Sequence, residues 1–343
     1  YHLHFSRVYG RTLCLDMETA DNVSKSGETF YNAENSSCFY GEDEYNCGLS
    51  SELQATAKTD LFEDEKVRQR SLADLRTWIK EHPNIKRCCI SSNFLLRFLR
   101  LKKFDLDETK KVLVKFLKMK TENPEWFKDL DVLDPKLSAL FDLGYIFPLP
   151  ERDEDGRTVI FVRTAQINPD NNVPMEVVRA MYTTFETLLL DEENQVSGFS
   201  YVFDMKDTGL YHLSGWTAQD ARMVINCSEK SLPMRHRQIF LMNLSFTLWT
   251  ILEFIKSLLT EKIRSRLHLL SDQKKLVGRI PTNILPKEYG GKVPISDIMS
   301  QWKQKMVSMR DLVLGHDDLE YREPETKKYS WSVSGCLRSL HIW

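Results

Sequence analysis

Residues 237–268 read RQIFLMNLSFTLWTILEFIKSLLTEKIRSRLH, a strand signal followed by a helix signal. The four residues 239–242 are all apolar, as in a strand whose sheet is covered on both faces. From about residue 248 the apolar residues recur at helical spacing, which predicts one long helix over 248–268. A strand that leads into a helix in this way is the repeating unit of a parallel α/β sheet.

The same alternation of strand and helix continues upstream. An Asp155-Gly156 turn precedes a β-branched run that predicts a strand, and a further strand is predicted within 197–207. Amphipathic helices are predicted over 177–192 and 218–233. We therefore predict an α/β domain built on a mostly parallel sheet flanked by helices.

A region of helical signals precedes the sheet, and it is basic. Helices are predicted over 71–82, 93–104 and 105–120, which together make a small all-α module. Between residues 86 and 120, eleven Lys and Arg residues outnumber three acidic ones. The simplest interpretation of these charges is solvated helix faces. We place this helical domain at 51–128.

The composition is that of an ordinary globular chain with an uneven charge distribution. The 343 residues are 42% hydrophobic and 28% charged, and the net charge of −2 argues against a nucleic-acid partner. Residues 1–65 hold thirteen acids and four bases, so we predict a disordered acidic leader over 1–50. We place the α/β domain at 140–294 and a C-terminal helix with a flexible tail at 295–343. The first methionine is Met17, where we expect translation to start.

The motifs of common α/β enzymes are missing from the sequence. It has no G-x-G-x-x-G or G-x-x-x-x-G-K-[ST] phosphate loop, no G-x-S-x-G turn and no H-E-x-x-H metal motif. The scattered His212, His236 and His268 are interpreted as structural. We therefore predict a binding protein rather than an enzyme, with no catalytic or metal-ligating residues and no cofactor.

Two further features bear on the compartment. The seven cysteines form no C-x-x-C pair and are expected to be reduced thiols. The apolar stretch 239–259 contains Asn243, Glu253 and Lys256, which argues against a membrane span. We expect a cytoplasmic protein.

The predicted helix 248–268 has more apolar surface than one buried face needs. At 100° per residue its apolar side chains cover an arc of roughly 200°, whereas docking on a core takes about 100°. Two interpretations stay open. Either the helix is sandwiched between two protein layers, or one apolar flank covers a lipophilic pocket and another faces a membrane.

Positive charges gather at the ends of the strand–helix unit. Lys262 and Arg266 are four residues apart on the predicted helix, and Arg235 and Arg237 lie just ahead of the strand. Because the connection brings these ends together, the two pairs are expected to converge. Clustered cations suit a multiply charged phosphate, and beside an apolar helix they favour an anionic membrane surface or phosphoinositide head groups.

Five stretches of this sequence resemble the CRAL-TRIO family, in their order and their spacing. The first, FLLRFLRLKKFDLDETKKVL, resembles the N-terminal helical module of that family. The others resemble landmarks of its lipid-binding domain, and they are GFSYVFDMKD, SLPMRHRQIFLMN, LLTEKIRSRLHLL and ILPKEYGG. The resemblance covers about residues 51–314 and is strongest to the branch of α-tocopherol transfer protein, clavesin and cellular retinaldehyde-binding protein. That branch consists of carriers that hold one hydrophobic ligand in a closed pocket under a helical lid.

The resemblance implies roles for three sets of residues. The positions that match the phosphatidylinositol bisphosphate site of the tocopherol carriers are Arg235, Arg237, Lys262 and Arg266. The lid falls on residues 249–259, with Trp249, Ile251, Leu252, Phe254, Ile255, Leu258 and Leu259 as its apolar members. The lipid pocket falls on Val162, Met181, Phe185, Phe199, Phe203, Val224, Cys227, Leu232, Ile239, Phe254 and Leu258.

Departures from the family pattern bear on the ligand. Two serines of the tocopherol pocket correspond to Met181 and Phe185, a tryptophan position is Thr208, and an Asn-x-Pro motif reads Asn243-Leu244-Ser245. The pocket is therefore expected to be more apolar than that of a tocopherol carrier.

These features together predict a monomeric intracellular carrier of a small hydrophobic lipid, such as a retinoid or a tocopherol-like compound. It would dock on endosomal or other membranes through phosphatidylinositol bisphosphate. The alternative is a phosphoinositide-binding trafficking adaptor of the clavesin type, in which the head-group site is itself the function.

Overall fold

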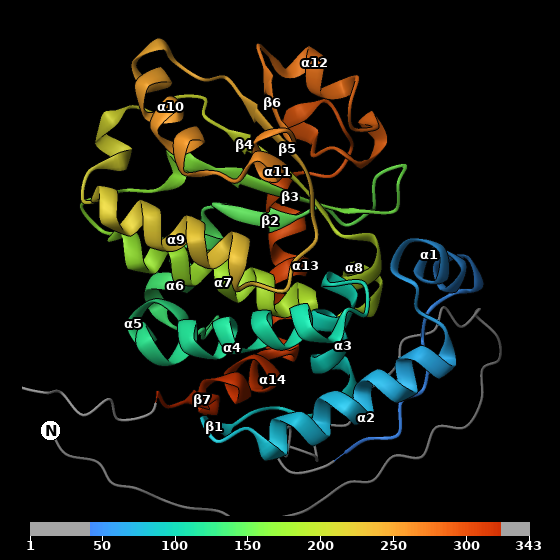
Figure 1. Cartoon of the computed structure of the whole chain (residues 1–343). Helices are drawn as coiled ribbons and strands as arrows, with labels where there is room; N and C mark the ends of the chain where they lie inside the picture. The colour runs from blue at the N-terminus through green and yellow to red at the C-terminus, as the bar shows by residue number, and fades with distance from the viewer. Residues whose placement is uncertain (1–41, 324–343) are drawn as a thin grey trace, which may run out of the picture. The chain divides into compact units, whose positions relative to one another are not determined.

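The computed structural model describes residues 42–323, and its centre is a five-stranded sheet in the order β2-β3-β4-β5-β6 (Figure 1). The strands are β2 (Ile146–Pro148), β3 (Thr158–Arg163), β4 (Phe199–Asp204), β5 (His236–Met242) and β6 (Leu267–Leu270). β3 to β6 are parallel, and β2 is an antiparallel edge strand. The predicted α/β class with a mostly parallel sheet is confirmed.

Helices that follow the strands differ sharply in how deeply they are buried. They are α7 (Pro174–Leu189), α8 (Glu192–Ser197), α9 (Ala218–Lys230), α10 (Trp249–Leu258), α11 (Glu261–Arg264) and α12 (Gln273–Val277). Most side chains of α7 are fully buried, because it lies between the sheet and the N-terminal helices. In contrast, α9 has no fully buried residue and α10 has one, Leu252.

The N-terminal helical module predicted from the sequence is present. It contains α1 (Ser51–Leu61), α2 (Glu65–Glu81), α3 (Ser92–Leu101), α4 (Leu106–Glu122), α5 (Pro124–Phe127) and α6 (Pro135–Asp142). The side chains of Ser50, Asp64 and Asp105 accept hydrogen bonds from the first turns of α1, α2 and α4. Such N-caps satisfy backbone N–H groups that lack a helical partner. One hydrophobic core joins this module to the sheet.

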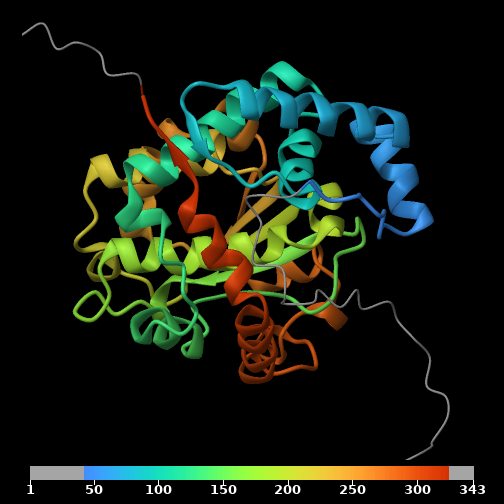
Figure 2. The ribbon, with the colours of Figure 1, turned by 90° about the horizontal axis from the view of Figure 1, so that it is seen from below.

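The C-terminal segment returns to the N-terminal helices (Figure 2). It contains α13 (Ile295–Ser308), α14 (Arg310–Leu314) and β7 (Glu320–Tyr321), which pairs with β1 (Ile85–Arg87). A flexible tail was expected after Asp317, yet Leu319 is buried and β7 pairs with β1. His316, just before this tail, is also buried, and its Nδ1 lies 3.1 Å from the Glu186 carboxylate. The expectation is therefore wrong for residues 318–323, and residues 324–343 lie outside the described part of the chain. Short 3-10 turns complete the chain: η1 (Thr164–Gln166), η2 (Leu210–Leu213), η3 (Phe246–Leu248), η4 (Thr282–Ile284), η5 (Lys287–Tyr289) and η6 (Gly315–Asp318).

The single helix predicted over 248–268 is wrong, because the chain breaks after α10. Leu259 and Thr260 are extended, the short helix α11 begins at Glu261, and residue 267 already belongs to β6. The backbone N–H of Thr260 donates to the carboxylate of Glu229 at the end of α9, at 3.2 Å to each oxygen. This contact between distant parts of the chain stabilises the break, and no local pattern indicates it.

Residues 42–50, expected to belong to a disordered leader, lie against the N-terminal helices instead. The Asp43 carboxylate accepts from the Ser92 backbone N–H at 2.7 Å and from the Arg76 guanidinium at 2.7 Å. Glu42 pairs with Lys80 at 2.5 Å. The acids of this segment therefore neutralise cations of α2 and cap α3. Residues 1–41 lie outside the described part of the chain.

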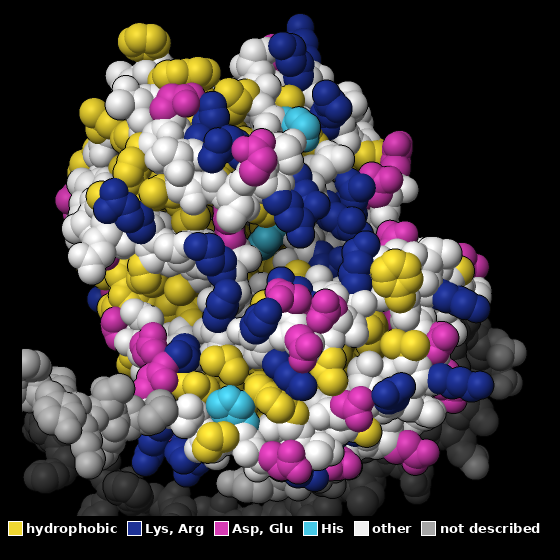
Figure 3. Space-filling model, viewed as in Figure 1, with side chains coloured by type: hydrophobic (Ala, Val, Ile, Leu, Met, Phe, Trp, Pro, Cys, Tyr) yellow, Lys and Arg dark blue, Asp and Glu magenta, His cyan; other side chains and the backbone are white. Residues whose placement is uncertain are grey.

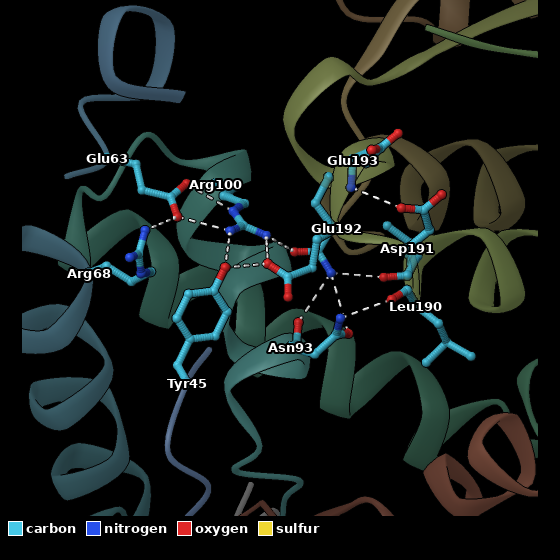
Figure 4. Close-up of polar contacts among 11 residues, drawn as sticks. Tyr45, Glu63, Arg68, Asn93, Arg100, Leu190, Asp191, Glu192 and Glu193 are labelled. Atoms are coloured by element: carbon cyan, nitrogen blue, oxygen red, sulfur yellow. Dashed lines mark hydrogen bonds and ion pairs between the residues drawn. The ribbon is translucent and has the colours of Figure 1, made fainter. Parts of the chain in front are cut away.

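A buried ion-pair network ties the connection between α1 and α2 to α3 and α8 (Figure 4). The Arg100 guanidinium contacts both carboxylate oxygens of Glu63 at 2.9 Å and the carboxylate of Glu192 at 2.8 Å. It also donates to the Gln195 side-chain oxygen at 2.8 Å and to the Tyr45 hydroxyl at 3.2 Å. The side chains of Arg100 and Glu63 are completely buried. A bidentate pair in such a setting fixes the relative placement of both elements.

Removal of one partner of this pair is expected to be costly. Glu63→Ala leaves the Arg100 charge buried with reduced compensation, and we expect the free energy of unfolding to fall by about 3 kcal/mol in urea titrations. The control is Asp74→Ala, which removes an exposed pair with Arg70 and should change stability by less than about 1 kcal/mol. Equal losses in the two variants would contradict the role assigned to the network.

Candidate functional site

Four basic residues expected from the sequence to converge do so at one edge of the sheet. Arg235 and Arg237 flank the first residue of β5, and Arg266 directly precedes β6. Parallel neighbours begin at the same edge, and the Ile239 N–H donates to the Arg266 carbonyl at 2.9 Å. Lys262 comes from α11, just ahead of β6. We call these four residues the cationic cluster.

Backbone carbonyls, rather than carboxylates, hold the arginines of the cationic cluster. Arg235 donates to the Val196 carbonyl, and the Arg237 Nε donates to the Ser197 carbonyl at 3.1 Å, both at the end of α8. Arg266 donates to the His236 carbonyl. None of the four side chains forms an ion pair with a carboxylate of residues 42–323. The cluster therefore has positive charge that remains uncompensated at close range.

A glycine permits the close approach of α8 to β5. Gly198, which ends α8, has φ +85°, and a Cβ there would lie 2.5 Å from the Arg235 carbonyl oxygen. Any other residue would push the two segments apart and strain its own backbone. The arginines thus reach the α8 carbonyls because residue 198 lacks a side chain.

Burial and mutual repulsion act against the charged forms of the cluster. Burial, followed by repulsion from Arg237, lowers the pKa of Arg235 to about 9. Burial and then Arg157 lower the pKa of Arg237, while burial and then Arg266 lower the pKa of Lys262. An anion bound at this place would relieve the repulsion and restore the charged forms. Figure 3 shows Lys and Arg side chains gathered on this face between α11 and α1.

Three residues near the cluster were not singled out from the sequence. Arg157 precedes β3, Lys102 ends α3, and Asp60 of α1 favours the charged forms of Arg235 and Arg237. The sequence could have indicated Arg157, because this residue precedes β3, and parallel strands such as β3 and β5 begin at the same edge of a sheet. No sequence signal indicated Lys102 or Asp60, because they come from the helical module.

The expected pocket residues fall into two groups. Val162, Phe185, Phe199 and Leu232 are fully buried in the packed core. The others keep accessible surface although most pack against that core, and they are Met181, Phe203, Val224, Cys227, Ile239, Phe254 and Leu258. These seven side chains come from α7, β4, α9, β5 and α10, and we call this set of partly accessible side chains the apolar chamber. Two surface cavities of ≈ 260 and ≈ 520 Å³ lie elsewhere, beside Trp302 and beside Asp272.

The expected lid is an exposed element rather than a sandwiched helix. Leu252 is its only fully buried residue, while Ile251, Phe254, Ile255, Leu258 and Leu259 are half-buried. Trp249 is 46% exposed, and Phe246, just before the lid, is 93% exposed. The Arg222 guanidinium of α9 lies 5.9 Å from the centre of the Phe254 ring. Of the two interpretations left open by the sequence, a helix with an exposed apolar flank agrees with these positions.

His236 is the first residue of β5, between Arg235 and Arg237, and its side chain is turned toward Tyr201 and α9. Its Nδ1 lies 2.7 Å from the Tyr201 hydroxyl, and its Nε2 lies 3.2 Å from the Ser228 carbonyl of α9. A carbonyl only accepts, so Nε2 carries the proton and the Tyr201 hydroxyl donates to Nδ1. Burial lowers the pKa of His236 to about 4, although the hydrogen bond to Ser228 opposes this. The histidine is therefore neutral and structural, as the sequence indicated.

Residues 42–323 contain no group of three His, Cys, Asp or Glu side chains that could hold a metal ion. No helix within those residues is long and apolar enough to cross a bilayer.

Comparisons with known proteins identify two family models within the chain. The model described as the CRAL/TRIO domain matches residues 143–291, and the one described as a Pinta-like UBA domain matches residues 64–137. The first match spans the sheet, the cationic cluster and the apolar chamber. The second falls on the N-terminal helices.

Individual relatives extend these matches. The "Alpha-tocopherol transfer protein-like" protein of Homo sapiens is 34% identical over 272 residues, which cover 78% of each chain. "Clavesin-2" of Homo sapiens is 26% identical over 294 residues, covering 85% of this chain and 88% of that one. A solved structure titled "Crystal structure of Sfh5" has a TM-score of 0.45 and 15% identity, covering 76% of this chain and 98% of that chain.

The neutral state of His236 predicts a dependence of stability on pH. The unfolded chain binds a proton with the ordinary histidine pKa of about 6.5, whereas the folded one does so only near pH 4. Between these values the unfolded state binds more protons, so the free energy of unfolding should fall as the pH is lowered from 6.5 to 4. His236→Gln should reduce this slope in urea titrations across that window. An unchanged slope would show that His236 is protonated in the folded protein.

Proposed function

Because the chain belongs to the CRAL-TRIO family, in the branch of alpha-tocopherol transfer protein-like proteins and clavesins, we propose that it carries a small hydrophobic lipid and docks on membranes through phosphatidylinositol bisphosphate. The apolar chamber would hold the lipid. The cationic cluster would bind the head group. Membership of the family supports binding of a lipid. The side chains of the apolar chamber and the cationic cluster support the more specific proposal of a small hydrophobic ligand and a phosphatidylinositol bisphosphate head group.

The uncompensated charge of the cationic cluster is the observation that carries the proposal. Three guanidinium groups and one ammonium group converge without an ion-pair partner among the described carboxylates, and burial disfavours the charged forms of Arg235, Arg237 and Lys262. A structural ion-pair network would include acids, as the network around Arg100 does. Phosphate groups supply several acceptors and negative charges at once, which suits forked guanidinium donors.

The lid supports a membrane surface as the place of exchange. Phe246 and Trp249 present aromatic rings to solvent next to the lid's apolar face. Such rings are favoured at the boundary between head groups and hydrocarbon. Within the described chain α10 packs mainly on α9 and η3, so it has few contacts to lose if it moves.

The apolar chamber favours a ligand without many polar groups. Its walls combine Met181, Phe203 and Ile239 with the half-buried face of α9. Burial of apolar surface yields about 25 cal/mol per Å², which is enough to compensate for removing a long hydrocarbon from a bilayer. A retinoid or a tocopherol-like lipid fits this description.

A second candidate function is a phosphoinositide-binding trafficking adaptor. The cationic cluster is better defined in the structure than the apolar chamber. In addition, the match to Clavesin-2 covers more of the chain than the match to the tocopherol-transfer-like protein. Mass spectrometry of lipids extracted from the purified protein separates the two. One stoichiometric neutral lipid supports the carrier, whereas phospholipid or no lipid supports the adaptor.

Neutralisation of the cationic cluster should strongly weaken membrane binding without loss of stability. The variant Arg235→Gln, Arg237→Gln, Lys262→Gln and Arg266→Gln is expected to bind vesicles that contain phosphatidylinositol bisphosphate at least a hundredfold more weakly, at about 1 kcal/mol per charge. Its thermal midpoint should not fall by more than a few degrees, because the charges that it removes repel one another. Vesicle flotation and thermal unfolding measure the two effects.

A matched control removes four exposed lysines away from the cluster, as Lys66→Gln, Lys274→Gln, Lys287→Gln and Lys305→Gln. It changes the net charge equally and should retain most of the binding. Equal binding by the cluster variant and the wild type would place the phosphoinositide site elsewhere.

A larger side chain in the apolar chamber should displace the lipid. Val224→Trp on α9 fills the chamber, and we expect its lipid occupancy in native mass spectrometry to fall to about a tenth or less of the wild-type value. Val307→Trp, on an exposed face of α13, is the control and should retain the wild-type occupancy. Full occupancy in Val224→Trp would contradict the assignment of α9 to the ligand cavity.

A further inference from the structure

An exposed aromatic residue ends α1 in a conformation that suits glycine. Phe62 is 63% exposed, although its neighbours Leu61 and Glu63 are fully buried. It caps α1 with φ 62° and ψ 28°, in the left-handed region. Helices commonly place glycine here because a side chain adds strain. The left-handed backbone of Phe62 and the exposure of its apolar ring to water both disfavour the folded state. This combination points to a role outside folding.

The neighbours of Phe62 hold its ring toward solvent. The Glu63 carboxylate accepts hydrogen bonds from Nε and Nη2 of Arg100 and lies 3.2 Å from the Arg68 guanidinium (Figure 4). Leu61 packs in a small apolar cluster with Val196 of α8. The residues on either side are therefore anchored inward. The ring is presented by a rigid turn and not by a loose loop.

Two lysines continue from this ring to the cationic cluster. The Lys103 ammonium lies 5.7 Å from the centre of the Phe62 ring. Lys103 and Phe104 have φ 54° and 60°, so the turn between α3 and α4 is also in the left-handed region. Lys102 is close enough to Lys262 to lower the pKa of that ammonium group. Neither Lys102 nor Lys103 forms an ion pair with a carboxylate of residues 42–323.

The geometry points to a second membrane contact, formed by Phe62, Lys102 and Lys103, at which the N-terminal helices dock on an anionic bilayer. This inference rests on the proposed membrane docking of the cationic cluster. An apolar ring beside unpaired ammonium groups matches the boundary between acyl chains and acidic head groups. Its continuity with the cationic cluster, visible as the gathering of Lys and Arg side chains between α11 and α1 in Figure 3, favours the same bilayer over a separate protein partner.

Phe62→Gly tests this contact without weakening the fold. Glycine suits the left-handed backbone, so the thermal midpoint should stay equal or rise, while partition to vesicles should fall about tenfold through loss of the buried ring. The vesicles contain phosphatidylcholine and phosphatidylserine with phosphatidylinositol bisphosphate, and flotation measures partition. Phe62→Asn, which also tolerates this backbone, should repeat the loss. Lys102→Gln with Lys103→Gln should weaken binding and reduce its dependence on salt.

The matched control is Leu133→Gly, which removes another exposed apolar side chain outside this surface. It should bind vesicles as the wild type does. Wild-type binding by Phe62→Gly would overturn the second contact and leave the ring to a protein partner, while the cationic-cluster proposal would stand. A wild-type protein that binds none of these vesicles would overturn both proposals.

Discussion

The parallel pairing of β5 with β4 and β6 determines where the chain's unpaired cations lie. Residues that precede parallel neighbours meet at one edge of the sheet, so Arg235, Arg237 and Arg266 meet although about thirty positions separate them. The Ile239–Arg266 hydrogen bond fixes this register. A shift by one residue would turn the alternate side chains of β5 to the other face and separate Arg237 from its carbonyl partner. The positions of these arginines are thus set first of all by the pairing of the strand backbones and only then by side-chain contacts.

The energetic cost of the cluster is compensated elsewhere in the molecule. Burial and like charges disfavour the charged form of Arg235, as its lowered pKa indicates, and the backbone carbonyls of α8 together with the nearby Asp60 oppose this effect. The α8 segment is held in turn by Arg100 at its first residue and by the packing of α1 on Val196. The N-terminal helices therefore hold α8 in place, and α8 in turn holds Arg235 and Arg237. In the proposed function, a bound phosphate head group would offset the cost of gathering these charges.

Sequence patterns were sufficient for β3, β4, β5, the principal helices and the four cations, since apolar periodicity is a local signal, whereas the predicted helix 248–268 runs into β6. Convergence of the cations was predicted from the strand–helix connection, but the continuous helix expected to carry Lys262 and Arg266 is wrong. The chain instead breaks at Leu259, where Glu229 accepts from the Thr260 N–H. The sequence also did not predict that Asp43 caps α3 or that the Phe62 ring is exposed. Each depends on a contact between segments far apart in the sequence, for which a local pattern contains no signal.

Coupling between the cationic cluster and the apolar chamber is the central claim, and transfer kinetics test it most directly. A fluorescent lipid ligand would be loaded into the protein, and its delivery to acceptor vesicles would be followed with and without phosphatidylinositol bisphosphate. We expect delivery to accelerate at least tenfold when the acceptor contains that lipid. Equal rates to both kinds of vesicle, with the ligand bound and released normally, would contradict the coupling of head-group binding to lipid exchange.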